Sequence, residues 1–252
     1  MSVEIVSVSR AYLRVAGPDA ADFLQRMVSN DVEILDVGES CPALLLTAKA
    51  RVIAPVVVWR RGTEDFLLVT EPELGEVVRA HLTRMRLRAQ CEIEPEQHRS
   101  TVVFGGGDGF VVPGLNATEV LDADLEDTLA PEELERRRIE AGVPRWGREI
   151  DDRILPAEAG LTETHVSFEK GCYPGQEPVA RLHYRGHANR GLRVLAVDGD
   201  VAPDDEVRYE DKVVGRITSA ADGVALAYVR AEVPADAELR TSAATLSAPP
   251  RP

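Results

Sequence analysis

Short apolar runs alternate with helical patterns in the first third of the chain. β-Branched and apolar residues that alternate or run together predict strands, and apolar residues spaced three or four positions apart predict helices. Strands are expected at residues 3–9, 11–17, 41–47, 51–60, 65–70 and 91–96, with helices beginning at Gly17-Pro18-Asp19 and spanning residues 71–87. This order of strands and helices predicts a ferredoxin-like α+β subdomain over residues 1–95.

A second α+β subdomain is expected over residues 96–188. Its clearest element is the helix "APEELERRRIEAG" (130–142), with Pro131 in its first turn, acidic residues early, arginines later and Gly142 at its end. The glycine-rich run "FGGGDGFVVPG" ahead of it lacks the Lys-Ser/Thr ending and the following helix of a phosphate-binding loop. We interpret this run as a turn between two strands.

The pattern changes at Gly191 to short strands separated by turns. Over residues 189–242 this pattern predicts a small all-β domain. Residues 243–252 are small, polar and rich in proline. We expect this last segment to be disordered, because it offers little apolar surface to bury.

Composition narrows the class of protein and its ligands. Of the 252 residues, 44% are hydrophobic and 29% charged, no apolar run is long enough to span a bilayer, and the N-terminus lacks a basic-then-apolar signal layout. We therefore expect a cytoplasmic protein without a membrane partner. The formal charge of −14 argues against direct binding of nucleic acid, and an anionic ligand would need a local basic patch.

Three widely spaced cysteines carry the first chemical signal. Cys41, Cys91 and Cys172 include no Cys-x-x-Cys pair, so we expect neither a disulfide framework nor an iron–sulfur centre held by this chain alone. Cys172 stands in "SFEKGCYPGQEPVARLHYRG" (167–186), between a Lys-Gly pair and a Pro-Gly turn. A nearby cation lowers a thiol pKa, and Lys170 is the candidate cation. From the residues alone, a reactive thiol and a buried, inert one both remain open.

Two histidines follow the cysteine at a spacing that resembles a metal site. Cys172, His183 and His187 give Cys-x10-His-x3-His, but a structural zinc site wants four ligands and usually a cysteine pair. We therefore expect no metal. A histidine acting as base to the thiol would need an orienting residue, which the sequence does not identify.

Arg136, Arg137 and Arg138 form the start of the densest basic segment. A helix turns three consecutive residues to different sides, so they cannot all face one site. One guanidinium can hold a ligand carboxylate through two hydrogen bonds. The others are expected on a solvated helix face, paired with nearby glutamates.

The segment "KGCYPGQEPVAR" (170–181) resembles the Lys-Gly-Cys-(Phe/Tyr)-x-Gly-Gln-Glu-x-x-Ala-Arg signature of the YgfZ family of folate-binding proteins. These proteins are relatives of the glycine-cleavage T-protein, an aminomethyltransferase. The resemblance covers nearly the whole chain. It includes "GPDAADFLQRMVSNDVEILDVGESCPALLLTAKARVI" (17–53), "RRRIEAGVPRWGREIDDRILPAEAGL" (136–161) and "VGRITSAADGVALAYVR" (214–230).

The resemblance implies a T-protein-like ring of ferredoxin-like α+β subdomains and a small C-terminal β-barrel around a site for tetrahydrofolate or a derivative. It also implies support of iron–sulfur cluster assembly or repair, and of iron–sulfur enzymes that modify tRNA. Folate and iron–sulfur proteins are therefore the expected partners. Cys172 is the expected working thiol, and folate contacts are expected from Arg138, Lys170, Tyr173, Gln176, Glu177 and Arg181. A folate-binding module in which Cys172 is only structural is the alternative without chemistry.

One departure from the T-protein pattern bears on enzymatic activity. The strand "ARVIAPVVVW" (50–59) places Ala54 and Pro55 where the resemblance predicts paired aspartates. Neither side chain can orient or polarise a reacting group. The resemblance therefore favours a binding or accessory protein over an aminomethyltransferase, with a one-carbon transferase that uses another carboxylate as the alternative.

Overall fold

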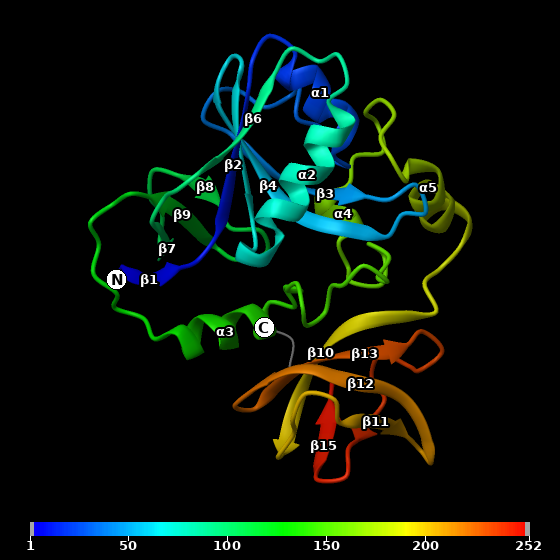
Figure 1. Ribbon diagram of the computed structural model, residues 1–252. Coiled ribbons are helices and arrows are strands. Elements are labelled where there is room, and N and C mark those ends of the chain that lie inside the picture. Colours follow the sequence, from blue (N-terminus) through cyan, green and yellow to red (C-terminus); the bar gives the residue numbers. More distant parts are fainter. Residues whose placement is uncertain (1–2, 250–252) are drawn as a thin grey trace.

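The structure, a computed structural model, describes residues 3–249. Two antiparallel sheets, of five and four strands, and a closed barrel of six strands make up its β-structure (Figure 1). The helices α1 and α2 cover the five-stranded sheet, and α3 runs beside the barrel. Within the described residues no helix is both long and apolar enough to cross a membrane.

The five-stranded sheet forms the expected first subdomain. Its strands run in the order β3 (Ser40–Leu46), β4 (Val52–Gly62), β5 (Asp65–Thr70), β2 (Ala11–Ala16) and β6 (Glu92–Glu96), and all neighbours are antiparallel. The order β4-β5-β2-β6 is that of a ferredoxin-like unit, and β3 extends it at one edge. The predicted α+β pattern is confirmed here.

Two helices bury their apolar stripes on one face of this sheet. Helix α1 (Ala20–Met27) contributes Phe23 and Leu24, and α2 (Gly75–Met85), which follows the short 3₁₀ turn η1 (Pro72–Leu74), contributes Val78 and Leu82. All four side chains are at most 2% exposed. Burial of each apolar side chain contributes about 1.5–3 kcal/mol, so this core holds the first subdomain together.

The four-stranded sheet recruits the N-terminal strand. Its order is β1 (Glu4–Val8), β7 (Ser100–Phe104), β9 (Ala117–Leu121) and β8 (Phe110–Val111). The sequence places residues 3–9 with the first subdomain, whereas β1 pairs with β7 in the second sheet. Local pattern predicts that a strand forms but does not identify its hydrogen-bond partner. The glycine-rich run forms the predicted turn between β7 and β8.

Helix α3 (Pro131–Glu140) joins this second sheet to the barrel. Leu134 packs on the cluster that contains Val6 and Val102, and Ile139 packs on Val224 and Leu226 of the barrel. Ile139 is fully buried. The helix therefore fixes how the barrel meets the rest of the molecule.

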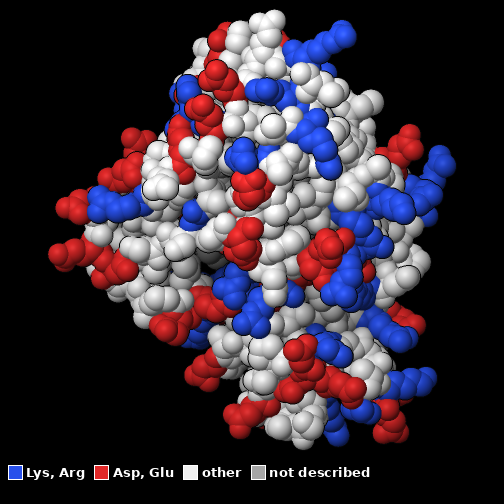
Figure 2. Space-filling view, viewed as in Figure 1, with Lys and Arg blue, Asp and Glu red and all other residues white. Residues whose placement is uncertain are grey.

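Two short helices lie beside β3. Helix α4 (Thr162–His165) contacts this strand, and α5 (Gln176–Arg185) follows the cysteine-containing loop. Val179 is the one buried residue of α5, whereas Arg181, Tyr184 and Arg185 are exposed. Lys and Arg side chains gather along the edge of the molecule where α5 lies (Figure 2).

The barrel is closed by a strand from the segment expected to be disordered. Its order is β10 (Arg190–Gly199), β13 (Val224–Arg230), β12 (Lys212–Ala221), β11 (Glu206–Tyr209), β14 (Leu239–Arg240) and β15 (Ala244–Ser247), and β15 pairs back with β10. Leu246 is fully buried in the barrel core. The expectation of disorder is therefore wrong for residues 244–247, because pairing on both sides compensates for the strand's single large apolar residue. Residues 250–252 lie outside the described residues.

Leu246 offers a direct test of barrel closure. Replacing Leu246 with Ala is expected to lower the free energy of unfolding by about 2–5 kcal/mol, because it leaves a cavity in the barrel core. Thr245 is exposed on the same strand. The control Thr245→Ala should stay within about 0.5 kcal/mol of the parent. Urea denaturation measures both values, and similar losses for the two variants would contradict the role given to Leu246.

Candidate functional site

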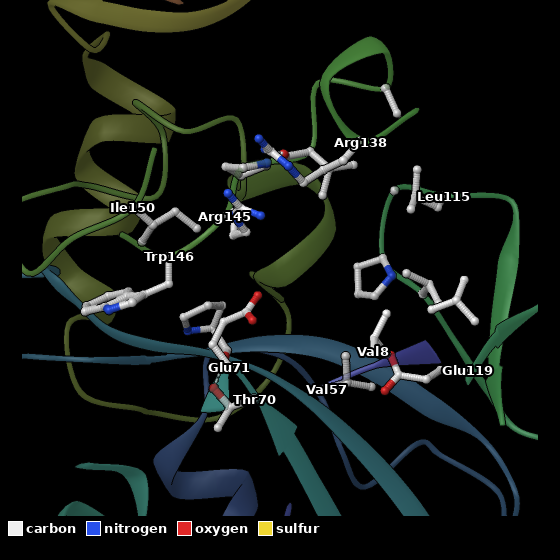
Figure 3. A pocket seen from close by; sticks show the side chains of 18 of the residues that line it. Val8, Val57, Thr70, Glu71, Leu115, Glu119, Arg138, Arg145, Trp146 and Ile150 are labelled. Carbon is white, nitrogen blue, oxygen red and sulfur yellow. Dashed lines mark hydrogen bonds between the residues drawn. The ribbon is translucent and has the colours of Figure 1, made fainter. Parts of the chain in front are cut away.

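A cavity of about 560 Å³ lies where β1, the middle of β4, the β8–β9 turn, α3 and α4 converge (Figure 3). This volume is in the range of sites that enclose a small organic molecule. Apolar side chains form much of its wall: Val8, Val57, Val69, Val112, Leu115, Trp146 and Ile150. Charged side chains are confined to two groups at its margins.

Arg10, Glu71 and Glu119 form the first charged group. Arg10 donates from Nη1 to Glu71 Oε2 at 3.1 Å and from Nε to Glu119 Oε2 at 3.3 Å. Glu119 is 2% exposed and also accepts a hydrogen bond from the Ser100 hydroxyl. Burial opposes the charge on Arg10, but the two carboxylates outweigh it and raise the pKa of the guanidinium. This corner of the cavity therefore holds two carboxylates bridged by one cation.

Arg138 and Arg145 belong to the second charged group. The two arginines lie on one side of the cavity, and Glu71 and Glu119 lie across from them (Figure 3). Arg138 has its donors committed: Nε and Nη2 bind the Glu135 carboxylate at 2.9 and 2.8 Å, Nη2 binds Ser219 Oγ at 2.8 Å, and Nη1 binds Glu149 Oε2 at 3.1 Å and the Val143 carbonyl oxygen. A guanidinium has five N–H donors, so none is left for a ligand.

Arg138 has a structural role that the sequence did not indicate, because its hydrogen bonds connect α3 to the barrel. Glu149, which is 1% exposed, also accepts from Ser219 Oγ at 2.6 Å, and its backbone oxygen accepts from Tyr228 Oη at 2.8 Å. Ser219 and Tyr228 belong to barrel strands β12 and β13. Arg138 and Glu149 thus fasten α3 and residues 143–149 to the barrel.

Arg145 is the arginine with capacity to bind a ligand. Its one ion pair among the described residues joins Nη1 to Glu135 Oε2 at 3.1 Å, and its side chain is 38% exposed. The sequence places Arg145 in the dense basic segment but does not distinguish it from its neighbours. Arg10, Glu71 and Glu119 were missed because they come from separate strands or strand ends with no shared motif.

Two further positions define the chemistry of the wall. Pro55 lines the cavity, Ala54 beside it is fully buried, and the Pro55 carbonyl accepts from Thr70 Oγ1 at 2.7 Å. These residues bring no ionisable group into the cavity. His165 on α4 also lines it, and burial lowers the pKa of its imidazole to about 4. That histidine is therefore neutral at pH 7.

The cysteine loop is a separate feature, anchored by Lys170. Its Nζ donates to the backbone oxygens of Val28 at 2.8 Å and Asn30 at 2.6 Å, and burial lowers the pKa of this ammonium to about 8. No hydrogen bond among the described residues joins Lys170 to Cys172. Lys170 therefore anchors the loop from a buried position, and its expected role as cationic neighbour of the thiol stays a prediction.

The rest of the motif supports the same loop. Tyr173 is 6% exposed and packs with residues of β3 and β4. Gly175 has φ +85°, and a Cβ there would lie 2.6 Å from the Thr47 backbone oxygen, so only glycine fits against the β3–β4 turn. Cys172 itself is exposed. The motif therefore presents an accessible thiol on a rigidly held loop.

The structure does not bring the predicted residues into one site. Of the residues expected to contact the folate, Arg138 lines the cavity, whereas Lys170, Tyr173, Gln176, Glu177 and Arg181 do not, and neither does the expected working thiol Cys172. The other two thiols are partly or fully buried, and burial raises the pKa of Cys41 to about 12 and also raises that of Cys91. His183 stacks on Phe168, with ring centroids 4.2 Å apart. Among residues 3–249 no group of three or more side chains is arranged to hold a metal ion.

The structure belongs to the class of α+β proteins in which two sheets are joined to a closed β-barrel and a cavity lies at the junction. Comparison with protein families identifies the family. Residues 2–128 match the GCVT N-terminal domain, and residues 189–251 match the CAF17 C-terminal β-barrel domain. The chain belongs to the GCVT N-terminal domain family and carries a CAF17-type barrel. The expected kinship with the T-protein superfamily is confirmed.

Individual relatives agree with this assignment. An iron–sulfur cluster assembly factor IBA57 homolog of Pyricularia oryzae is 30% identical over 249 residues, covering 86% of this chain and 62% of the relative. The chain thus spans less than two thirds of that protein. The mouse assembly factor IBA57 (Mus musculus) is 25% identical over 278 residues, covering 88% of this chain and 76% of the relative.

A solved structure shares the whole fold. The glycine cleavage system aminomethyltransferase T from Bartonella henselae has a TM-score of 0.80 at 18% identity, covering 98% of this chain and 84% of that one. The predicted T-protein-like α+β architecture with a C-terminal barrel is confirmed. At this identity the likeness concerns the fold alone.

Arg138 provides the test of how the barrel is attached. Arg138→Ala is expected to lower the free energy of unfolding by about 3–5 kcal/mol, because it leaves the Glu149 carboxylate buried without its cation. Arg136 lies on the same helix, is about half exposed and pairs only with exposed glutamates. The control Arg136→Ala should cost at most about 1 kcal/mol. Chemical denaturation followed by tryptophan fluorescence distinguishes the two, and equal losses would show that Arg138 is an ordinary surface arginine.

Proposed function

We propose that this protein binds a folate in the cavity and acts as an iron–sulfur cluster assembly factor, with Cys172 as its working thiol. One observation carries the folate assignment: the cavity sets carboxylates on one side and an arginine with unused donors on the other. The names of the relatives support the assembly role. Iron–sulfur enzymes, including those that modify tRNA, are the proposed clients.

The chemistry of a folate complements this arrangement. A pterin carries an amino group and a ring N–H side by side, which suit a carboxylate through two parallel hydrogen bonds. Glu71, whose side chain is 21% exposed, can still accept such bonds. The other end of a folate carries carboxylates, which suit a guanidinium. We assign that contact to Arg145 in place of Arg138. The rings of the folate would pack on the valine-rich wall between Glu71 and Arg145.

The exposed loop suits a different task from ligand binding. Thiolates are preferred ligands of iron in iron–sulfur clusters, and a cluster generally needs four. The loop offers one accessible thiol, while Cys41 and Cys91 are shielded. A cluster or sulfur species handled at Cys172 would therefore take its remaining ligands from another protein. The rigid anchoring by Lys170 and Tyr173 supports such an exchange.

A one-carbon transferase is the second candidate. The cavity contains two carboxylates, Glu71 and Glu119, which could supply the acid or base that Ala54 and Pro55 cannot. Glu119, however, is bound by both Arg10 and Ser100, and the proposed pterin contact would occupy Glu71. A group that takes a proton in a reaction must be free to reach it. We therefore rank this candidate below the accessory role.

Calorimetry tests the folate assignment. Tetrahydrofolate is expected to bind with a micromolar Kd, about −8 kcal/mol. Arg145→Ala should lose about 1.5–3 kcal/mol of that affinity by removing a charged hydrogen-bond donor. Arg148 is exposed and does not line the cavity. Arg148→Ala is the matched control and should bind like the parent. Absence of heat at millimolar ligand would exclude the folate site.

A cellular assay tests the thiol. In cells lacking the gene, Cys172→Ser is expected to fold normally, because the side chain is exposed, but to leave iron–sulfur enzyme activity at the level of the deletion. Cys41→Ala removes a shielded thiol and should restore activity as the parent does. Protein levels measured alongside separate loss of function from loss of the protein. Full activity with Cys172→Ser would mean that the cysteine is structural.

A further inference from the structure

Helix α5 and the loop before it form an exposed surface that neither the cavity nor the folding core uses. We define the α5 surface as Lys49, Cys172, Arg181, Tyr184 and Arg185. All five residues are exposed. Lys49 belongs to the β3–β4 turn, against which Gly175 packs directly at the start of α5. The turn, the thiol loop and the helix are therefore held together as one rigid unit.

The α5 surface carries three exposed cations, Lys49, Arg181 and Arg185. Arg181 and Arg185 stand one helical turn apart, on the same side of α5. Within residues 3–249, neither they nor Lys49 form an ion pair. The exposed acids nearest in the chain, Glu169 and Glu177, pair with neither arginine. In a chain with a formal charge of −14, these three cations form a basic patch on the turn and the helix that flank the thiol loop.

An ordered aromatic group lies within the same surface. Tyr184 is 67% exposed, and its ring stands edge-on to His183 with centroids 4.8 Å apart. His183 in turn stacks on Phe168. A tyrosine already held by its neighbours loses little conformational entropy when a partner covers it. Tyrosine and arginine are also the residues that most often dominate the energy of protein interfaces.

We propose that the α5 surface docks an acidic protein, so that Cys172 lies at the edge of the contact. Charge complementarity selects the partner: Lys49, Arg181 and Arg185 attract a short acidic surface, and Tyr184 supplies an apolar contact at its centre. A nucleic acid is disfavoured because a long polyanion would also meet the negative field of the rest of the molecule. The inference rests on the proposed function only in assigning Cys172 to a partner protein.

Disulfide exchange at Cys172 measures this docking with a defined probe. The probe is a peptide of five glutamates and a leucine, with an N-terminal cysteine activated as a 2-pyridyl disulfide. The Cys172 thiolate attacks the peptide sulfur, a mixed disulfide forms and pyridine-2-thione leaves. At low salt we expect this peptide to label Cys172 about tenfold faster than the matching lysine peptide, an advantage that salt reduces.

Charge reversal locates the effect. In R181E/R185E the advantage of the glutamate peptide should fall below about twofold. Arg84 and Arg88 are likewise exposed, four residues apart and without an ion pair among the described residues. R84E/R88E changes the net charge equally and should keep the advantage. Each peptide rate is divided by the rate of the small neutral reagent 2,2′-dithiodipyridine on the same protein, which removes any change in the reactivity of the thiol itself.

Three results would overturn the proposal. The first is equal labelling by the glutamate and lysine peptides, and the second is an equal loss in R84E/R88E. The third is suppression of labelling by a single-stranded RNA at concentrations where polyglutamate of the same length has no effect. Tetrahydrofolate binding, measured on the same variants, is expected to be unchanged. A failure of the docking surface is therefore distinguishable from a failure of the folate site.

Discussion

The ion pair between Arg138 and Glu149 is the interaction on which the arrangement of this molecule depends. It joins α3, the segment that carries Arg145 and strand β12 of the barrel, all within one buried network. Desolvating two charges is expensive, and the cost is offset only when every donor and acceptor finds a partner. Arg138 meets that condition with five hydrogen bonds. Because Glu135 also binds Arg145, the barrel attachment and the cavity share one carboxylate.

A second buried cation anchors the loop that carries Cys172. Lys170 has its ammonium on the carbonyls that follow α1, in a site that lowers its pKa. Both buried cations come from the stretches that carry the family resemblance. Neither cation is itself the residue proposed to act on a ligand or partner. Arg138 fixes the wall that holds Arg145, and Lys170 fixes the loop that presents Cys172, so each acts by holding another residue in place.

Local signals in the sequence predicted the elements well and their assembly less well. The β-branched runs gave the strands of the first sheet, and the caps of residues 130–142 gave α3. The pairing of β1 with β7 and the closing strand β15 were missed, because strand partners are chosen by tertiary contacts. The candidate site residues show the same contrast between local motifs and tertiary contacts. The motif predicts Cys172 as a site residue, which stays a prediction, whereas Arg10, Glu71 and Glu119 meet only in three dimensions.

The pairing of β1 has a consequence for how the chain reaches this fold. Val6 of β1 pairs with Val102, which lies far along the chain, whereas the strands of the first sheet pair among themselves. Contacts between distant parts of a chain are slow to form because the intervening loop must close first. During synthesis, the first sheet can therefore assemble while β1 still has an unpaired edge. Strand β1 gains its partner only when the ribosome has delivered β7, and the second sheet becomes complete only with β8 and β9. Until β7 arrives, β1 is an unpaired strand edge that needs protection in the nascent chain.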